Sequence, residues 1–176
     1  MNRHLLGAIA GFSATAAMTL AMAAMYRRLT PKERYPLPPG EITSKITEDL
    51  GMAGSLDEQL QVDLTLAGHF GYGAAAGAIY PTFARGLPGS SPLLNGTFYG
   101  LLVWAVSYLG WLPAFGILRP ATEHPAGRNI VMLLAHVVWG GATGAVADGL
   151  ARAGPTFLAN GRMRDTHHPR GRAADA

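Results

Sequence analysis

The sequence contains no cysteine and has little charge for a chain of 176 residues. The missing cysteine excludes disulfide bonds and cysteine-ligated metal sites. Charged residues make up only 14% of the chain, whereas an average soluble domain has about 25%. The charge gathers at the amino terminus, in residues 27–63, in residues 119–128 and in the tail. Long, nearly uncharged segments lie between these regions, and such segments are typical of membrane proteins.

Four apolar segments are long enough to cross a bilayer, for which about 18 or more residues are needed. They cover residues 5–25, 64–84, 93–112 and 130–148. The first segment also resembles a secretory signal peptide, with AMA as a cleavage-like tripeptide. Its apolar run, however, exceeds the roughly 7 to 15 residues of a signal peptide. We therefore predict an all-α integral membrane four-helix bundle formed by residues 1–152.

The connection between the first two predicted spans contains two distinct patterns. YPLPPG at residues 35–40 predicts an extended segment, because consecutive prolines disfavour helix. Ile42, Ile46 and Leu50 then recur at the spacing that lines one face of a helix, and Gly51 follows as a helix-ending residue. We expect a short amphipathic helix here, either at the membrane surface or packed on the protein's own loops.

Local sequence signals mark where the later helices begin and end. SLDE at residues 55–58 has the pattern of a capping box with Ser55 as the N-cap, so the second span should start near Leu56. Ser91 and Pro92 are an N-cap and a first helical residue for the third span. Residues 153–176 are polar and rich in arginine, and we expect this basic tail to be disordered.

A short duplicated unit places two histidines in the same apolar setting. HFGYGAAAGAI at residues 69–79 and HVVWGGATGAV at residues 136–146 share the order histidine, aromatic, glycine and glycine. The second and fourth spans are separated by one span, so they should cross the bilayer in the same direction. Matched positions in parallel helices lie at similar depth, and exposing an imidazole to lipid is costly. We therefore expect His69 and His136 to face the bundle interior at one level.

Pairs of glycines four residues apart lie in three of the predicted spans. Such pairs let two helix backbones approach closely, which is how helices associate in lipid. The predicted helix-packing residues are Gly7, Gly11, Gly73, Gly77, Gly140 and Gly144.

The two histidines allow a structural and a functional interpretation. In the first, each neutral imidazole bonds to a hydroxyl or carbonyl of a neighbouring helix, and Ser13, Thr15, Thr19 and Ser107 offer hydroxyls. In the second, the pair handles a ligand or protons, or ligates haem or a metal, since an ionisable group inside a membrane is a candidate site. His69 and His136 are therefore the candidate residues for ligand binding or proton relay.

The motifs of several enzyme and cofactor classes are absent from the sequence. It has no P-loop, no HExxH, no GxSxG and no dinucleotide-binding glycine pattern after a strand. We assign no catalytic residue, no metal ligand and no cofactor. The net charge of +3 does not require a nucleic-acid partner, because basic residues beside membrane spans are expected. The sequence also has no nucleic-acid-binding signature.

Four motifs together resemble those of the uncharacterised YagU-like inner-membrane proteins of bacteria. They are LPPGEIT at 37–43, HFGYGAAAGAIYP at 69–81, WAVSYLGWLPAFGIL at 104–118 and AHVVWGGATG at 135–144. The resemblance covers roughly residues 5–150 and implies a multi-span inner-membrane protein without an established reaction. It supplies no catalytic residues.

Two classes of function follow from these observations. The first is a non-enzymatic membrane bundle that binds a lipid, a small solute or a partner, which includes a second copy of itself. The alternative is a redox or proton-linked transport component that uses His69 and His136. We expect location in the bacterial inner membrane. Lysine and arginine are equally divided between the two sides, and the acidic first loop favours cytoplasmic termini.

Overall fold

A computed structural model describes residues 2–52 and 54–153 of the chain. Within these residues all regular structure is helical, as predicted. The long helices are α1 (Arg3–Tyr26), α2 (Pro38–Asp49), α3 (Glu58–Phe83), α4 (Pro92–Ala105) and α6 (Ala126–Ala153). The π-helical segment η3 (Val106–Trp111) continues α4 into α5 (Leu112–Ala114), and short turns form η1 (Pro31–Glu33), η2 (Ala84–Gly86) and η4 (Ala121–Glu123). Apart from Ala153, the predicted tail lies outside the described residues.

Three helical segments are long and apolar enough to cross a membrane. They are α1, the continuous segment Pro92–Ala114 formed by α4, η3 and α5, and α6. Helix α3, which contains the predicted span 64–84, is not among them. Glycines add little apolar surface to this helix, and His69, Tyr72 and Tyr80 add polar groups. The prediction of a four-helix bundle is therefore confirmed only as an all-helical chain with three such segments.

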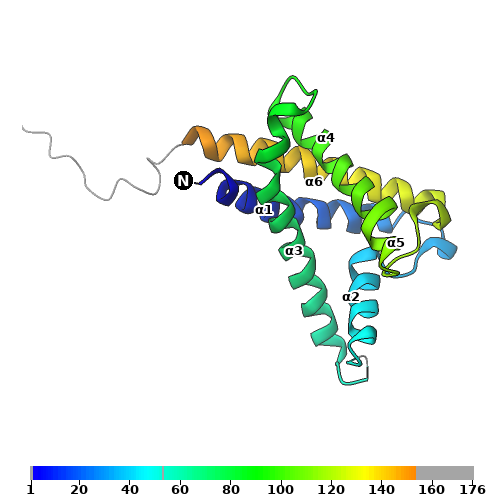
Figure 1. Ribbon diagram of the computed structural model, residues 1–176. Helices are drawn as coiled ribbons and strands as arrows, with labels where there is room; N and C mark the ends of the chain where they lie inside the picture. The colour runs from blue at the N-terminus through cyan, green and yellow to red at the C-terminus, as the bar shows by residue number, and fades with distance from the viewer. Residues whose placement is uncertain (1, 53, 154–176) are drawn as a thin grey trace, which may run out of the picture.

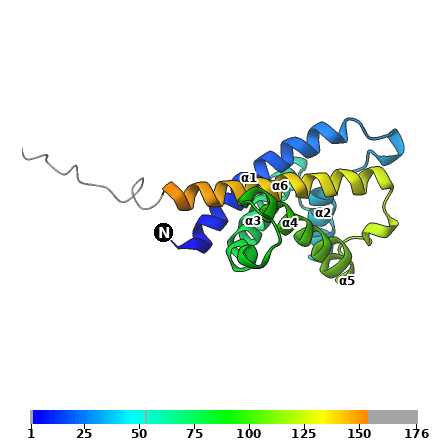
Figure 2. The same ribbon diagram turned by 90° about the horizontal axis from the view of Figure 1, so that it is seen from above.

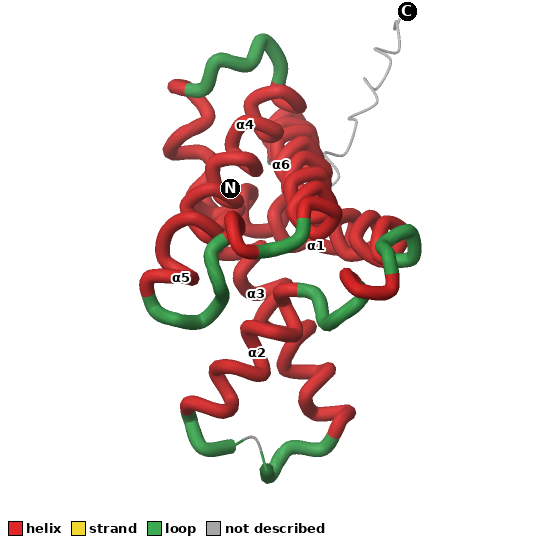
Figure 3. Tube along the Cα trace, turned by 90° about the vertical axis from the view of Figure 1, so that its right-hand side faces the viewer, coloured by secondary structure: helices red, strands yellow, loops and turns green. Residues whose placement is uncertain are grey.

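Helix α3 stands steeply across α1 and α6 (Figure 1). Helices α1 and α6 run in opposite directions, and the amino end of α1 lies on the same side as the carboxyl end of α6 (Figure 1). In Figure 2, α1 and α6 are seen along their length while α3 is seen nearly end-on. The expectation that α3 and α6 run parallel is therefore wrong. Helix α2 lies against the first half of α3, and this α2–α3 hairpin projects from the rest (Figures 1 and 3).

Glycines allow α1 and α3 to touch backbone to backbone where they cross. A Cβ atom placed on Gly11 would lie 2.2 Å from the carbonyl oxygen of Gly73, and one on Gly77 would lie 2.4 Å from the carbonyl oxygen of Gly7. Both distances are far below van der Waals contact. At this crossing only residues without a side chain fit.

Helices α4 and α6 approach in the same manner, with a second set of glycines. A Cβ atom on Gly96 would lie 2.1 Å from the carbonyl oxygen of Gly140, and one on Gly100 would lie 2.2 Å from that of His136. Gly140 and Gly144 were predicted as helix-packing residues, whereas Gly96 and Gly100 were not. These two glycines have the same four-residue spacing, so the pattern itself was sufficient to find them.

The helix ends agree with some of the sequence signals and correct others. Ser91 caps α4 and Gly51 follows α2 with a φ of 70°, both as predicted. Helix α3, however, begins at Glu58, and its N-cap is Asp57, whose carboxylate accepts from the Leu60 amide at 2.7 Å. The predicted capping box at Ser55 is therefore wrong.

The proline-rich segment before α2 is also more helical than its composition predicted. Helix α2 already begins at Pro38, with Leu37 as its N-cap. The first turn of a helix needs no backbone N–H groups for its own hydrogen bonds, so prolines are tolerated there. The extended conformation predicted for residues 35–40 is therefore confined to the part before the helix.

Arg128 at the start of α6 fixes the first loop and the amino end of α2. Its guanidinium donates to the carbonyl oxygens of Tyr35 at 2.8 Å and of Pro36 at 2.7 Å, and to the Glu41 carboxylate at 3.2 Å. It also lies 3.4 Å from the centre of the Tyr35 ring, within the range of a cation–π interaction. The Arg128 side chain is only 3% exposed. These contacts, which we call the Arg128 clamp, set the position of α2.

Candidate functional site

A cavity of about 460 Å³ lies between α1, α2, α3, the α4–η3 segment and α6. Its lining combines residues that are distant in the sequence, such as Met18 of α1, Ile42 of α2 and Met132 of α6. Most of the lining side chains are aliphatic, aromatic or methionine. Among the described residues that form the lining, none is Asp, Glu, Lys or Arg. The cavity is therefore an uncharged, mainly apolar compartment, which is the usual character of a small-molecule site.

One end of the cavity is closed by the crossing of α1, α3, η3 and α6. Thr15, Ser107, His136 and Trp139 line this end, and each is at most 6% exposed. Polar atoms are thus concentrated where the protein excludes solvent. We call this part the closed end.

The other end opens between α2 and the first half of α3. The mouth is lined by Ile46 of α2, by Leu50 and Met52 of the connection that follows it and by Leu64 of α3, and these side chains are between 37% and 66% exposed. All four side chains at this mouth are apolar. The cavity therefore opens toward its surroundings through a hydrophobic mouth and carries its polar groups inside.

Helix α3 runs along the cavity and places His69 in the inner part of the cavity. Leu64 lies at the mouth, and Gly73 lies at the closed end, where α3 crosses α1. His69 is placed one helical turn before Gly73, so its ring lies near the closed end. Its Nε2 atom is buried but has no hydrogen-bond partner among the described residues. A buried polar atom without a partner is unfavourable in the empty protein, and a ligand can supply the missing bond.

His136 lines the same cavity from α6 but differs from His69 in its hydrogen bonding. Its Nδ1 atom donates to the carbonyl oxygen of Met132 at 2.8 Å, and its ring packs edge-on against Tyr108. The two histidines that the duplicated unit picked out therefore meet in one cavity, although their helices are not parallel. His136 already has a partner within its own helix, whereas Nε2 of His69 has none.

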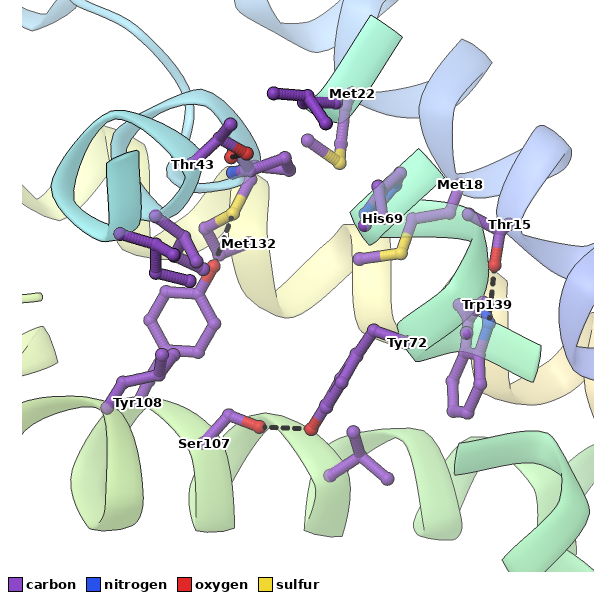
Figure 4. A pocket seen from close by; sticks show the side chains of 18 of the residues that line it. Thr15, Met18, Met22, Thr43, His69, Tyr72, Ser107, Tyr108, Met132 and Trp139 are labelled. Carbon is purple, nitrogen blue, oxygen red and sulfur yellow. Dashed lines mark hydrogen bonds between the residues drawn. The ribbon is translucent and has the colours of Figure 1, made fainter. Parts of the chain in front are cut away.

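Other polar groups inside the cavity are paired with one another. Figure 4 shows the Tyr72 hydroxyl facing that of Ser107, and the two oxygens are 2.8 Å apart. The Trp139 indole donates to the Thr15 hydroxyl at 3.2 Å, and Thr15 donates to the Gly11 carbonyl at 2.8 Å. Tyr72, Ser107 and Trp139 were not chosen from the sequence as site residues. The three-residue spacing of His69 and Tyr72 on one helical face was the signal for Tyr72.

The predicted packing glycines lie at the edges of this site. Gly73 itself lines the cavity, while Gly7, Gly11 and Gly77 form the crossing of α1 and α3 beside it. Gly140 and Gly144 lie where α6 approaches α4 most closely. The glycine contacts therefore lie between helices whose side chains form the cavity walls.

Comparison with known proteins identifies the family of the chain. A family model described as "Family of unknown function (DUF6789)" matches residues 1–156. No curated protein and no solved structure matches the chain. The match supports an uncharacterised family, as the four sequence motifs implied, but nothing in it connects the chain to YagU-like proteins or to bacteria.

Proposed function

The chain belongs to DUF6789, a family of unknown function, and we propose from its cavity that it is a membrane protein that binds an apolar small molecule or lipid between its helices. Three segments able to cross a bilayer support the membrane assignment. The uncharged cavity with its hydrophobic mouth supports the ligand class, because an apolar molecule gains free energy by leaving water or by filling a matched cavity.

The hydrophobic mouth is the observation on which this proposal chiefly rests. A cavity that served a water-soluble solute would carry polar groups where the solute enters. Here the exposed side chains of the lining are Ile46, Leu50, Met52, Leu64 and Tyr72, and the one hydroxyl among them, that of Tyr72, is already paired with Ser107. A ligand dissolved in the bilayer meets no desolvation barrier at such a mouth.

Two glycines of α3 provide a matched test of binding. Gly68 lines the cavity, Gly71 does not, and a Cβ atom at either position meets nothing within 4 Å. Both Gly68→Trp and Gly71→Trp should therefore fold, but only the first indole occupies ligand space. Native mass spectrometry of protein purified in mild detergent should show a co-purified apolar adduct in the wild type and in Gly71→Trp. We expect Gly68→Trp to lose it, and equal occupancy in all three proteins would contradict the proposal.

The second candidate function uses the two imidazoles as a unit, for proton transfer or as ligands of haem or a metal. The supporting observation is that His69 and His136 line one cavity. The Nδ1 bond of His136 to a carbonyl is the arrangement that orients a ligating histidine. An absorption spectrum of the purified protein tests the haem branch, since a Soret band lost in His136→Ala would favour this candidate over the first.

The cellular setting stays part of the proposal. We propose the bacterial inner membrane, with both termini in the cytoplasm and with a lipid, a membrane partner or a second copy of the chain as the contacting species. A reporter fused to the carboxyl terminus tests the orientation. Activity of a reporter that works only outside the cytoplasm would overturn it.

A further inference from the structure

We propose that the cavity takes an uncharged molecule with a carbonyl or hydroxyl head on a long apolar chain, inserted head first, so that the head oxygen pairs with Nε2 of His69 and the chain leaves between α2 and α3. This inference rests on the proposed binding function and adds the chemistry and the direction of the ligand. It follows from the charge of the lining, the position of one unpartnered atom and the polarity of the two ends.

The lining sets the charge of the ligand. Because the described lining residues include no Asp, Glu, Lys or Arg side chain, a charged head would lose its hydration without gaining a counter-ion from these residues. Such a transfer is costly in an apolar site. A carboxylate, a phosphate ester and a quaternary amine are therefore poor ligands, whereas a ketone, a quinone ring or an alcohol is compatible.

The unpartnered nitrogen sets the type of head group. Nε2 of His69 can donate to a carbonyl oxygen in one tautomer and accept from a hydroxyl in the other. Its burial without a hydrogen bond in the protein means that a ligand oxygen satisfies it at no loss of an existing bond. The Tyr72–Ser107 hydroxyl pair, one turn along the same helical face, offers a second donor. The other histidine, His136, already uses its Nδ1 atom on Met132.

The polarity of the two ends sets the direction. The closed end has Thr15, Ser107 and His136, and the mouth has only apolar side chains. A molecule with an oxygen at one end therefore fits only with that end inside, since the reverse would bury alkyl carbons against hydroxyls and leave the nitrogen of His69 unpaired. Figure 4 shows His69, Tyr72 and Met18 directed into the same space from α3 and α1.

A photoreactive ketone tests the charge, the head group and the direction of the ligand in the full-length protein. In 4-decylbenzophenone the carbonyl is both the proposed head oxygen and the reacting group. On irradiation it abstracts a hydrogen atom from a nearby C–H bond, and the two radicals combine into a new C–C bond. The site of attachment, mapped by peptide mass spectrometry, therefore reports where the head group lies. Methionines are present at both ends, with Met18 and Met132 inside and Met52 at the mouth.

We expect labelling of Met18 or Met132 that unlabelled 2-undecanone suppresses and that undecanoate at neutral pH does not. His69→Leu should weaken the competition by 2-undecanone about five-fold, which corresponds to one neutral hydrogen bond of about 1 kcal/mol. His69→Gln, which keeps a donor and an acceptor, should retain most of the binding. Thr43→Val is the control, because Thr43 lines the cavity but its hydroxyl already donates to Pro39 at 3.0 Å.

The alternative outcomes separate this inference from the function on which it rests. Competable labelling at Met52 would show binding with the head at the mouth, and would overturn the direction while keeping the proposed function. Competition by 2-undecanone that is as effective in His69→Leu as in the wild type would overturn the role of His69. Effective competition by undecanoate would overturn the uncharged ligand class. Labelling that no competitor suppresses would overturn the binding function itself.

Discussion

The indole N–H of Trp139 on α6 donates to the backbone carbonyl of Gly11 on α1 at 3.1 Å, across 128 positions of the chain. The same N–H lies 3.2 Å from the Thr15 hydroxyl. Trp139 is 3% exposed, so no water competes for these bonds. A single side chain thus joins two helices that could cross a membrane, at the closed end of the cavity.

We predict that Trp139→Phe lowers the free energy of unfolding by about 1–2 kcal/mol, because it leaves a buried carbonyl with one partner fewer and removes part of an aromatic side chain. Trp104→Phe is the matched control, since the Nε1 atom of Trp104 is buried without a hydrogen-bond partner among the described residues. That substitution should cost less. Thermal melting in detergent measures both, and an equal loss in the two variants would contradict the role given to the Trp139 bond.

The crossing of α1 and α3 predicts a sharp difference between two glycines of α3. In Gly77→Ala the new methyl group would lie 2.4 Å from the Gly7 carbonyl oxygen, so the helices must separate. In Gly71→Ala the methyl group meets nothing within 4 Å. We expect Gly77→Ala to destabilise by about 1–3 kcal/mol and Gly71→Ala to be neutral or stabilising. If both variants melt like the wild type, α1 and α3 do not touch at this glycine.

Helix α6 allows the same comparison at its contact with α4. In Gly140→Ala the methyl group would lie 2.2 Å from the Gly96 carbonyl oxygen, whereas in Gly149→Ala it meets nothing within 4 Å. We expect the first variant to lose about 1–3 kcal/mol of stability and the second to lose none. The melting temperatures of the two purified variants measure the difference. Equal values would show that α4 and α6 are held apart by other residues.

The Arg128 clamp predicts that charge alone does not replace a guanidinium. Arg128→Lys keeps the positive charge but cannot reach Tyr35, Pro36 and Glu41 at once, and it loses the planar stacking on the Tyr35 ring. We expect a loss of about 2–4 kcal/mol, because buried acceptors lose a charged donor. Arg119→Lys, outside this cluster, serves as the control. A wild-type melting temperature in Arg128→Lys would show that the loop does not depend on these bonds.

A pH dependence follows from Glu33 in the same loop. The Thr30 hydroxyl and amide donate to its carboxylate, and together with the Gly127 amide and the charge of Arg128 they hold the pKa of Glu33 below its ordinary value. The folded state therefore binds this proton less tightly than the unfolded state. The resulting stability is present above the ordinary pKa and is lost as the pH falls through the lower folded value.

Comparison of the wild type with Glu33→Gln tests this dependence. We expect the wild type to melt at a higher temperature at neutral pH, and the difference to shrink as the carboxylate is protonated in acid. Melting temperatures from neutral pH to about pH 3 measure the effect. A difference that stays constant over this range would contradict the assignment to the Glu33 charge.

The sequence predicted those features that depend on the residues of one helix alone. Uncharged length predicted α1, α4 and α6, and Ser91 predicted the start of α4. His69 and His136 were chosen because a polar group in an apolar helix is costly to expose, and both do line an interior cavity. That argument does not depend on how the helices are oriented, so it holds even though the prediction that α3 and α6 are parallel was wrong.

Contacts between distant segments were not predictable from these patterns. Helix α3 crosses α1 at glycines that lie opposite one another on the two helices, and the sequence of a single helix does not reveal which glycine faces which partner. The contacts of Arg128 were not predicted, because nothing in the sequence of residues 119–128 indicates that its partners are the carbonyls of Tyr35 and Pro36. The role of α2 as a cavity wall likewise depends on that distant clamp.

Because α2 is both a wall of the cavity and the segment that Arg128 holds, occupancy and loop anchoring are thermodynamically linked. Thr43 and Ile46 line the cavity from the same helix whose Glu41 bonds to Arg128. A molecule that contacts these residues binds only when α2 is in place, and so it shifts the equilibrium toward the anchored loop. Reciprocity then requires that loosening the anchor weakens binding by the same free energy. A mutation more than 80 positions from the wall it disturbs can therefore change affinity without touching the ligand.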